Sequence, residues 1–255
     1  MDIYKYMSFE QFVSMVEKNQ LYLTRIDRWE DVYEGVLIKV LFNKLKEECF
    51  GNYQKIGIYN ILEQRVFQSI YAQSWSTKEA ESDAMWRIYS PNNIGVRIKV
   101  DCDKTRDRIN TSIKCKGYIM KDFKVTYEDE IPYPNTALKD FILDDEIMYP
   151  IKYKRVAFQH EDEYRFATCF FEEVKIVKGI LRNIDRYGEI DKDELQFGLK
   201  KDPLTISYDI CLCDIKEVVL DPRAPKYHKE TFERYCDNRG IPNTLRKQST
   251  LYTFV

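Results

Sequence analysis

Residues 160–165, with the sequence HEDEYR, hold the densest set of side chains that could do chemistry. We expect residues 155–170 to contain a strand, in which alternate side chains share one face. Glu161, Glu163 and Arg165 would then lie in one row. Two carboxylates about 7 Å apart repel each other and raise a pKa, unless a cation such as Arg165 lies close by. The row would suit a substrate with hydroxyl groups and a developing positive charge. A solvent-facing strand would show the same pattern.

A second group combines hydroxyl groups with aromatic rings. Residues 70–76 are expected to form a strand, and Ser74 and Ser76 near its end would point to one face. Aromatic rings here could stack on a planar or cationic group, with a cation–π energy of roughly 0.5–2 kcal/mol. The rings could equally belong to the hydrophobic core. The candidate rings are those of Trp75, Trp86 and Tyr89.

Two further stretches place charges among aromatic residues. The first is a loop at residues 29–35, WEDVYEG, which follows Arg25 and could form the rim of a binding site through Asp31 and Glu34. A salt-bridged loop would have the same composition. The second is the N-terminal run Tyr4, Lys5 and Tyr6, which offers one cation between two rings or forms an edge strand.

A basic stretch and several absent motifs limit the reaction classes. Residues 104–124 contain seven Lys and Arg side chains, which could contact phosphate groups or cover a solvated β-hairpin. The sequence has no Gly-rich phosphate loop, no GxSxG and no HExxH, which disfavours P-loop, α/β-hydrolase and zincin activities. With two histidines and no CxxC pair, we assign no residue as a metal ligand.

The composition predicts a folded protein without a strong charge bias. The chain has 255 residues, 44% of them hydrophobic and 14% aromatic, and a formal net charge of −2. No apolar run is long enough to span a bilayer, and no secretory leader is recognisable, so we expect a cytoplasmic protein away from membranes. The seven cysteines are expected to be reduced and mostly buried, including Cys211 and Cys213 on one predicted strand.

The periodicity predicts one α+β domain over residues 1–255 with a mixed or mostly antiparallel sheet. Strands are not regularly followed by helices, which disfavours a doubly wound parallel sheet. Residues 128–149 are expected to be a loop and a short helix, and residues 172–203 are mixed, with no assigned role for 172–204. The helices are expected near 9–16, 36–50, 54–70, 81–90 and 226–239, and further strands near 21–24, 95–100, 118, 125–127, 205–213, 215–220 and 251–254.

The order of these motifs resembles a bacterial domain family of unknown function that is met among mobile elements and in phage-defence neighbourhoods. The family typically shows an aromatic-basic-aromatic start, an FNDPxEG-like loop, an FS…MW…Y…GV block and an ExExR block. This chain matches it with residues 4–6, 29–35, the SWS, MW and Gly95-Val96 elements, and EDEYR at 161–165. The loop departs from the pattern at Trp29-Glu30 and Val32-Tyr33.

The same order is similar, more loosely, to the ADP-ribosyltransferase superfamily. Those enzymes place a basic or aromatic residue on a first strand, a Ser/Tyr motif on a second and a catalytic Glu, often Glu-x-Glu, on a third. The corresponding triplets here start at Tyr4, Ser74 and Glu161. The first strand lacks the Arg or His usually found there. The resemblance implies an ADP-ribosyltransferase-like fold and NAD as substrate.

The resemblance also implies roles for individual residues. Glu163 would stabilise the positive charge on the ribose when nicotinamide leaves, and Glu161 would orient the acceptor. Trp75 or Trp86 would stack on nicotinamide. Arg25 or Lys5 would hold the pyrophosphate.

Three functions are therefore kept open. The first is an NAD-cleaving or ADP-ribosyl-transferring effector in a bacterial toxin or phage-defence role, with an unidentified protein or nucleic-acid acceptor and a partner protein from the same operon. The second is a nuclease or other nucleic-acid-acting effector, with the basic stretch on phosphate and Mg²⁺ on Asp31, Glu34, Glu161 and Glu163. The third is a sensor or interaction module without catalysis.

Overall fold

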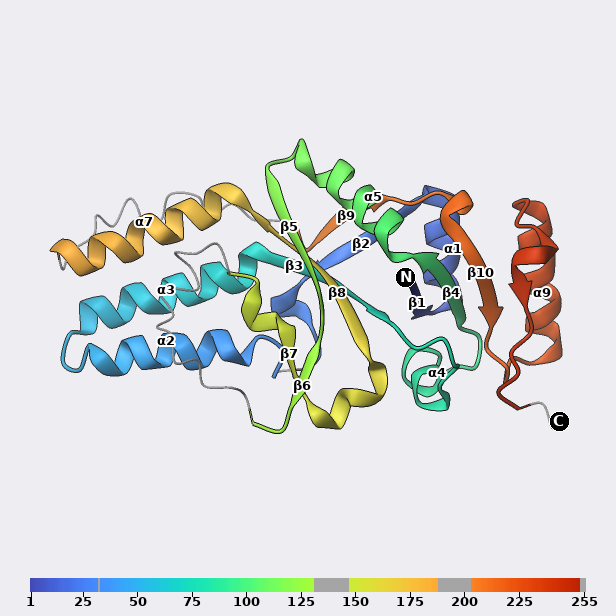
Figure 1. The fold of residues 1–255 in the computed structure, drawn as a ribbon, viewed down its shortest axis with the longest axis horizontal. Coiled ribbons are helices and arrows are strands. Elements are labelled where there is room, and N and C mark those ends of the chain that lie inside the picture. The colour runs from blue at the N-terminus through green and yellow to red at the C-terminus, as the bar shows by residue number, and fades with distance from the viewer. Residues whose placement is uncertain (32, 131–146, 188–202, 253–255) are drawn as a thin grey trace.

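The computed structural model describes residues 1–31, 33–130, 147–187 and 203–252. It is an α+β structure built on one large, mostly antiparallel sheet (Figure 1). The strands of this sheet are β1 (Asp2–Met7), β2 (Gln20–Arg25), β3 (Ile70–Ser76), β4 (Val96–Asp101), β5 (Tyr118–Lys124), β8 (Glu163–Phe170), β9 (Thr205–Asp209), β10 (Ile215–Leu220) and β11 (Arg246–Lys247).

The sheet branches at β3. One path runs β11-β10-β4-β1-β3-β2-β9, and a second leaves β3 through β8 to β5. The pair β10–β11 is parallel, and a separate small parallel pair joins β6 (Thr126–Glu128) to β7 (Tyr153–Arg155). The prediction of a mixed, mostly antiparallel sheet is therefore confirmed.

Helices cover both faces of the sheet. They are α1 (Phe9–Lys18), α2 (Val36–Glu48), α3 (Tyr53–Ser69), α4 (Asp83–Tyr89), α5 (Cys102–Lys114), α7 (Phe171–Tyr187) and α9 (Lys226–Asn238). In Figure 1, α2, α3 and α7 lie side by side and project away from the sheet. Short 3₁₀ helices are η1 (Ile26–Arg28), η2 (Tyr149–Lys152), η3 (Val156–Glu161), η4 (Leu212–Asp214) and η5 (Asn243–Leu245).

Two hydrophobic cores follow from the alternation of side chains along β3 and β8. Ile70 and Ala72 of β3 point into the core that α2, α3 and α7 share. Tyr71 and Trp75 point to the other side, into the core beneath α1, α5 and α9. Each face of these central strands is thus buried against helices, which fixes the register of the strands and hence the direction of every side chain on them.

Three segments differ from the sequence-based prediction. Residues 102–114, part of the basic stretch, form helix α5 rather than a β-hairpin, because Asp101 caps the helix and Ile109 and Ile113 are buried at helical spacing. Residues 171–187 form α7, which continues through Gly179 because an apolar stripe packs on α3. The predicted strand 205–213 ends at Asp209, and Cys211 and Cys213 lie in the connection to β10, at the start of η4.

Other predictions fall outside the described residues or stay untested. Three predictions lie outside the described residues: the loop and helix within 131–146, the part of the mixed segment at 188–202, and the end of the terminal strand at 253–254.

Within the described ranges, no helix combines the length and apolar character needed to cross a membrane.

Gly35 helps to position Glu34, because it sets the path of the chain between Glu34 and α2. Its φ is +70°, and a Cβ atom added there would lie 2.9 Å from Cε1 of Phe67. We therefore expect Gly35→Ala to lower the free energy of unfolding by about 1–3 kcal/mol, through backbone strain and displacement of the ring. Urea denaturation followed by circular dichroism would measure the change.

Gly57 provides the matched control. It lies exposed within α3, where an added Cβ would meet nothing within 4 Å. Gly57→Ala is expected to raise the free energy of unfolding by about 0.5–1 kcal/mol, because alanine favours the helix. Equal effects of the two substitutions would contradict the role assigned to Gly35.

Candidate functional site

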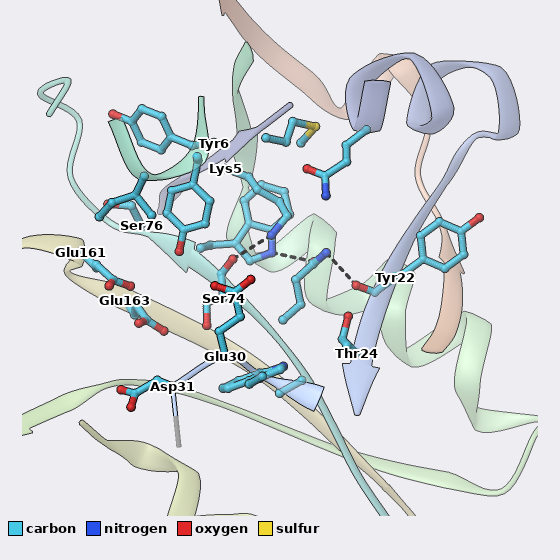
Figure 2. Close-up of a pocket in the computed structure, with 18 of the residues that line it drawn as sticks. Lys5, Tyr6, Tyr22, Thr24, Glu30, Asp31, Ser74, Ser76, Glu161 and Glu163 are labelled. Carbon is cyan, nitrogen blue, oxygen red and sulfur yellow. Dashed lines mark hydrogen bonds between the residues drawn. The ribbon is translucent and has the colours of Figure 1, made fainter. Parts of the chain in front are cut away.

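The candidate site lies where the large sheet opens. Along one edge, β3 pairs with β8 over its whole length. Along the other edge, β2 pairs with Tyr71 and Ala72, and β1 pairs only with Ser76. Residues 73–75 therefore have no strand partner on this edge. A pocket of about 1050 Å³ lies over the opening, and β1, β2 and β3 all contribute to its wall (Figure 2).

Two polar side chains bridge the opening. Lys5 of β1 donates a hydrogen bond from Nζ to the Ser74 carbonyl oxygen at 3.1 Å. Gln73 donates from Nε2 to the Tyr22 carbonyl of β2 at 3.0 Å, and its Oε1 accepts from Trp75 Nε1 and the Tyr208 hydroxyl. Burial lowers the pKa of Lys5 to about 8, against an opposing effect of the Glu163 charge. These side chains donate hydrogen bonds to backbone carbonyl oxygens that would otherwise accept them from a neighbouring strand.

A buried charge cluster forms one wall of the pocket. Arg165 is fully buried in β8 and donates two hydrogen bonds to Glu34, at 2.7 and 2.8 Å. Its Nε donates to Glu163 at 2.8 Å. Lys154 of β7 lies among three carboxylates, with Nζ 3.2 Å from Glu34, 3.0 Å from Glu161 and hydrogen-bonded to Glu163. Two cations thus hold three glutamates at one place.

The two glutamates of the pair ionise differently. Burial, the hydrogen bond to the neighbouring Glu163 carboxylate and the charge of Glu163 together raise the pKa of Glu161 to about 7. Burial also opposes ionisation of Glu163, but the charges of Arg165 and Lys154 outweigh it and lower its pKa below the ordinary value. At neutral pH Glu161 is therefore about half protonated, and Glu163 is ionised.

The local backbone differs from the predicted strand in a way that matters for this pair. Residues 156–161 form η3, and β8 begins only at Glu163. Between them Asp162 adopts a left-handed conformation, with φ of 44°, and its side chain contacts Thr77 and Lys124. Glu161 is thus not in one strand row with Glu163 and Arg165. The turn brings the two carboxylates together instead.

The backbone of Glu163, at the start of β8, is held by the side chain of Tyr127. The amide N–H of Glu163 donates to the hydroxyl of Tyr127 in β6 at 2.8 Å. Tyr127 also lies close enough to Glu163, Lys154 and Glu161 for their charges to affect its pKa, which burial raises. Glu163 is therefore held at both its backbone and its side chain.

Most of the predicted site residues do meet in this pocket. Figure 2 shows the Glu161 and Glu163 carboxylates side by side, with Ser74, Ser76, Glu30 and Asp31 around the same space. Tyr89 of α4 is partly exposed, and the pKa of its hydroxyl is raised by burial and by the charges of Glu161 and Glu163. The predicted residues that line the pocket are Tyr4, Lys5, Tyr6, Asp31, Glu34, Ser74, Trp75, Ser76, Tyr89, Glu161 and Glu163.

Three predicted residues are not part of the lining. Arg25 donates two hydrogen bonds to Asp27, at 2.7 and 3.0 Å, and does not reach the pocket. Trp86 is fully buried, packs edge-on against Tyr6 and donates from Nε1 to Glu81, so it has no face to offer a ligand. Arg165 lies behind Glu34 and Glu163 and acts by positioning them.

Sequence reasoning missed the residues that β7 and η3 supply. Lys154, Arg155 and Phe158 all line the pocket, together with Arg28 of η1. The run Tyr153-Lys154-Arg155 repeats the aromatic-basic character of residues 4–6 and could have signalled a second wall.

The carboxylates of the proposed magnesium site are already paired with protein cations. Glu34, Glu161 and Glu163 contact Lys154 or Arg165, and Asp31 lies 3.5 Å from Arg155. Across the residues with described positions, no group of three His, Cys, Asp or Glu side chains is placed to hold a metal ion. Several cations of the basic stretch are also paired, for example Arg106 with Asp122, Arg108 with Asp214 and Lys124 with Asp162.

The proton on Glu161 predicts a pH-dependent stability. Because its pKa is raised from 4.5 to about 7, the folded state holds this proton more tightly than the unfolded state does. The stabilising contribution is complete below about pH 4.5 and is lost as the pH rises through 7. Since Glu161→Gln cannot ionise, the wild-type free energy of unfolding should fall relative to this variant, by on the order of 2 kcal/mol between pH 5 and 8.

Denaturation of both proteins at a series of pH values would measure this difference. A difference that stays constant from pH 5 to 8 would show that Glu161 ionises like an ordinary carboxyl group.

Comparison with known proteins points to the segment that carries the glutamate pair. Residues 85–166 match a family described as Protein of unknown function (DUF2971). No curated protein and no solved structure matches the chain. The matched segment begins in α4, ends in β8 and includes Lys154, Glu161 and Glu163. Over about a third of its length, the chain is thus similar to this family of unknown function.

Proposed function

We propose that this protein cleaves the bond between nicotinamide and ribose in NAD and transfers the ADP-ribosyl group to an acceptor or to water. One observation carries the proposal. Two glutamates, Glu161 and Glu163, lie side by side on the wall of an aromatic-lined pocket, held there by Lys154 and Arg165. Two carboxyl groups with separated pKa values are suited to divide the tasks of charge stabilisation and proton transfer.

Glu163 has the properties needed at the reacting carbon. When the C1′–N bond of NAD breaks, the bonding electron pair leaves with nicotinamide and positive charge develops on the ribose. An ionised carboxylate that is already fixed by two cations, on a residue whose backbone amide is held by the Tyr127 hydroxyl, needs no reorganisation to stabilise that charge. Glu163 would also accept a hydrogen bond from a ribose hydroxyl.

Glu161 has the properties needed for the acceptor. As the acceptor oxygen or nitrogen bonds to C1′, its proton must be removed. A carboxyl group with a pKa of about 7 is partly ionised at neutral pH and can take up that proton. The reaction then requires Glu161 in its ionised form and Glu163 in its ionised form.

The remaining wall fits the other parts of NAD. Tyr89, rather than the buried rings of Trp75 and Trp86, would lie against the nicotinamide ring, and the hydroxyls of Ser74 and Ser76 would contact its amide. The pocket volume of about 1050 Å³ is ample for a dinucleotide, since drug-sized ligands occupy pockets of roughly 300–1000 Å³.

The biological setting rests on sequence resemblance alone. The motif order supports a role as a toxin or phage-defence effector in the bacterial cytoplasm, working with a partner protein encoded in the same operon. A nuclease is less well supported, because Lys154 and Arg165 neutralise the carboxylates that would bind Mg²⁺. A binding module without catalysis would use the same pocket.

Glu163→Gln tests the proposal directly. Removal of the charge should reduce nicotinamide release by about 10²–10³-fold, because the developing cation loses its fixed counter-charge. Purified protein would be incubated with NAD, with and without bacterial lysate, and free nicotinamide followed by chromatography. Thermal unfolding of the variant would verify that it is folded.

Glu79→Gln is the matched control, since Glu79 is exposed and lies outside the pocket lining. Its activity should equal that of the wild type. Nicotinamide release that survives in Glu163→Gln would refute the assignment. Binding of NAD without release by the wild type would favour the non-catalytic module, and nicking of nucleic acid that chelation abolishes would favour the nuclease.

A further inference from the structure

Arg155 lies at the wall of the same pocket. It is the last residue of β7, and its guanidinium lies against two aromatic rings. The centroid of the Tyr33 ring is 3.9 Å from its Cζ, and that of the Phe158 ring is 5.1 Å away. These ring contacts restrain the guanidinium without using its N–H groups.

The hydrogen-bonding capacity of Arg155 is largely unused. A guanidinium has five N–H donors. Within the described part of the chain, the side chain makes one long contact, from NH2 to Asp31 Oδ1 at 3.5 Å, and its buried Nε has no hydrogen-bond partner. The side chain is 40% exposed, so its outer donors are open to the pocket.

Four of the other cations considered for this site are committed elsewhere. Lys154 is surrounded by carboxylates, and Arg165 is fully buried with partners on each of its nitrogens. Lys5 donates to the Ser74 carbonyl, and Arg25, which the sequence suggested for pyrophosphate, is paired with Asp27 away from the pocket. Arg155 combines a restrained guanidinium, free donors and exposure to the pocket.

We propose that Arg155 binds a phosphate group of the ligand that occupies this pocket. The proposal rests on the proposed function, because that function supplies a ligand with a diphosphate. A planar guanidinium donates two parallel hydrogen bonds to phosphate oxygens, which is the geometry that such groups favour. The long contact to Asp31 is weak enough for a phosphate oxygen to replace it.

The position of Phe158 supports this assignment. Its ring centroid lies 4.6 Å from Lys154 Nζ and 5.1 Å from Arg155 Cζ. One aromatic ring thus contacts both the cation that serves the glutamate pair and the cation that would serve the phosphate. A phosphate on Arg155 would lie near the reacting end of the ligand.

The test compares ligands that differ in phosphate content. Isothermal titration would measure binding of ADP-ribose, ADP and adenosine to the full chain. Arg155→Met should weaken binding of ADP-ribose and ADP by about 10- to 100-fold, since hydrogen bonds between charged groups are lost. Adenosine binding should be unchanged. Arg155→Lys keeps the charge but not the planar donor pair, so its affinity for ADP-ribose should lie between those of the wild type and Arg155→Met.

Two further variants make the test independent of folding losses. Asp31→Asn should tighten ADP-ribose binding, because it removes the carboxylate that competes for Arg155 while its oxygen can still accept from the Tyr33 amide. Arg87→Met removes one exposed cation outside the pocket lining and should leave binding unchanged. Competition by inorganic phosphate would distinguish a free phosphate site from one that needs the whole nucleotide.

The outcomes separate this inference from the proposed function. Equal affinity of wild type and Arg155→Met for ADP-ribose would overturn it, as would absence of ADP and ADP-ribose binding to the wild type. Phosphate-dependent binding that Arg155→Met weakens, without nicotinamide release by the wild type, would support the site and refute the enzymatic proposal. Nicotinamide release by the wild type, together with an unchanged KM for NAD in Arg155→Met, would support the enzymatic proposal and refute the phosphate site.

Discussion

The buried guanidinium of Arg165 is the interaction on which the site depends. A charge that is fully removed from water is tolerated only where opposite charges and hydrogen bonds surround it. Glu34 reaches it from the turn before α2, Glu163 from its own strand and the Ile151 carbonyl from η2. These groups come from three separate parts of the chain. Arg165 can therefore be satisfied only when the loop after β2, the end of η2 and the start of β8 are all in place.

This requirement explains why the glutamates ionise as they do. Three carboxylates and two cations leave one excess negative charge in a region with little water. A proton on Glu161 removes that excess, which is why burial and the neighbouring Glu163 raise its pKa while the cations lower that of Glu163. The division of roles within the pair is thus a consequence of the local charge balance and not of either residue alone.

The sequence predicted the parts of the fold and site that depend on local pattern. The strand at 70–76 and the helix around 226–239 agree with the structure. The structure also brings residues 4–6, residues 74–76, Glu161 and Glu163 to one pocket. Helix α5 was missed because only a few apolar residues mark its buried side among many charges. Trp86 was misjudged because sequence cannot distinguish a buried ring from an exposed one. Lys154 escaped notice because its three partners are brought together only by tertiary structure.

The branching of the sheet at β3 has a consequence for how this pocket could diversify. The wall that carries Glu163 belongs to the continuous β3–β8 ladder, whereas the opposite walls belong to β1 and β2, which are connected to each other through the short helix α1. Changes in α1 or in the facing side chains of β1 and β2 would alter the width and shape of the opening without disturbing the register of the glutamates. The shape of the opening and the arrangement of the glutamates thus reside on separable structural units, so the first can drift during evolution while the second is retained.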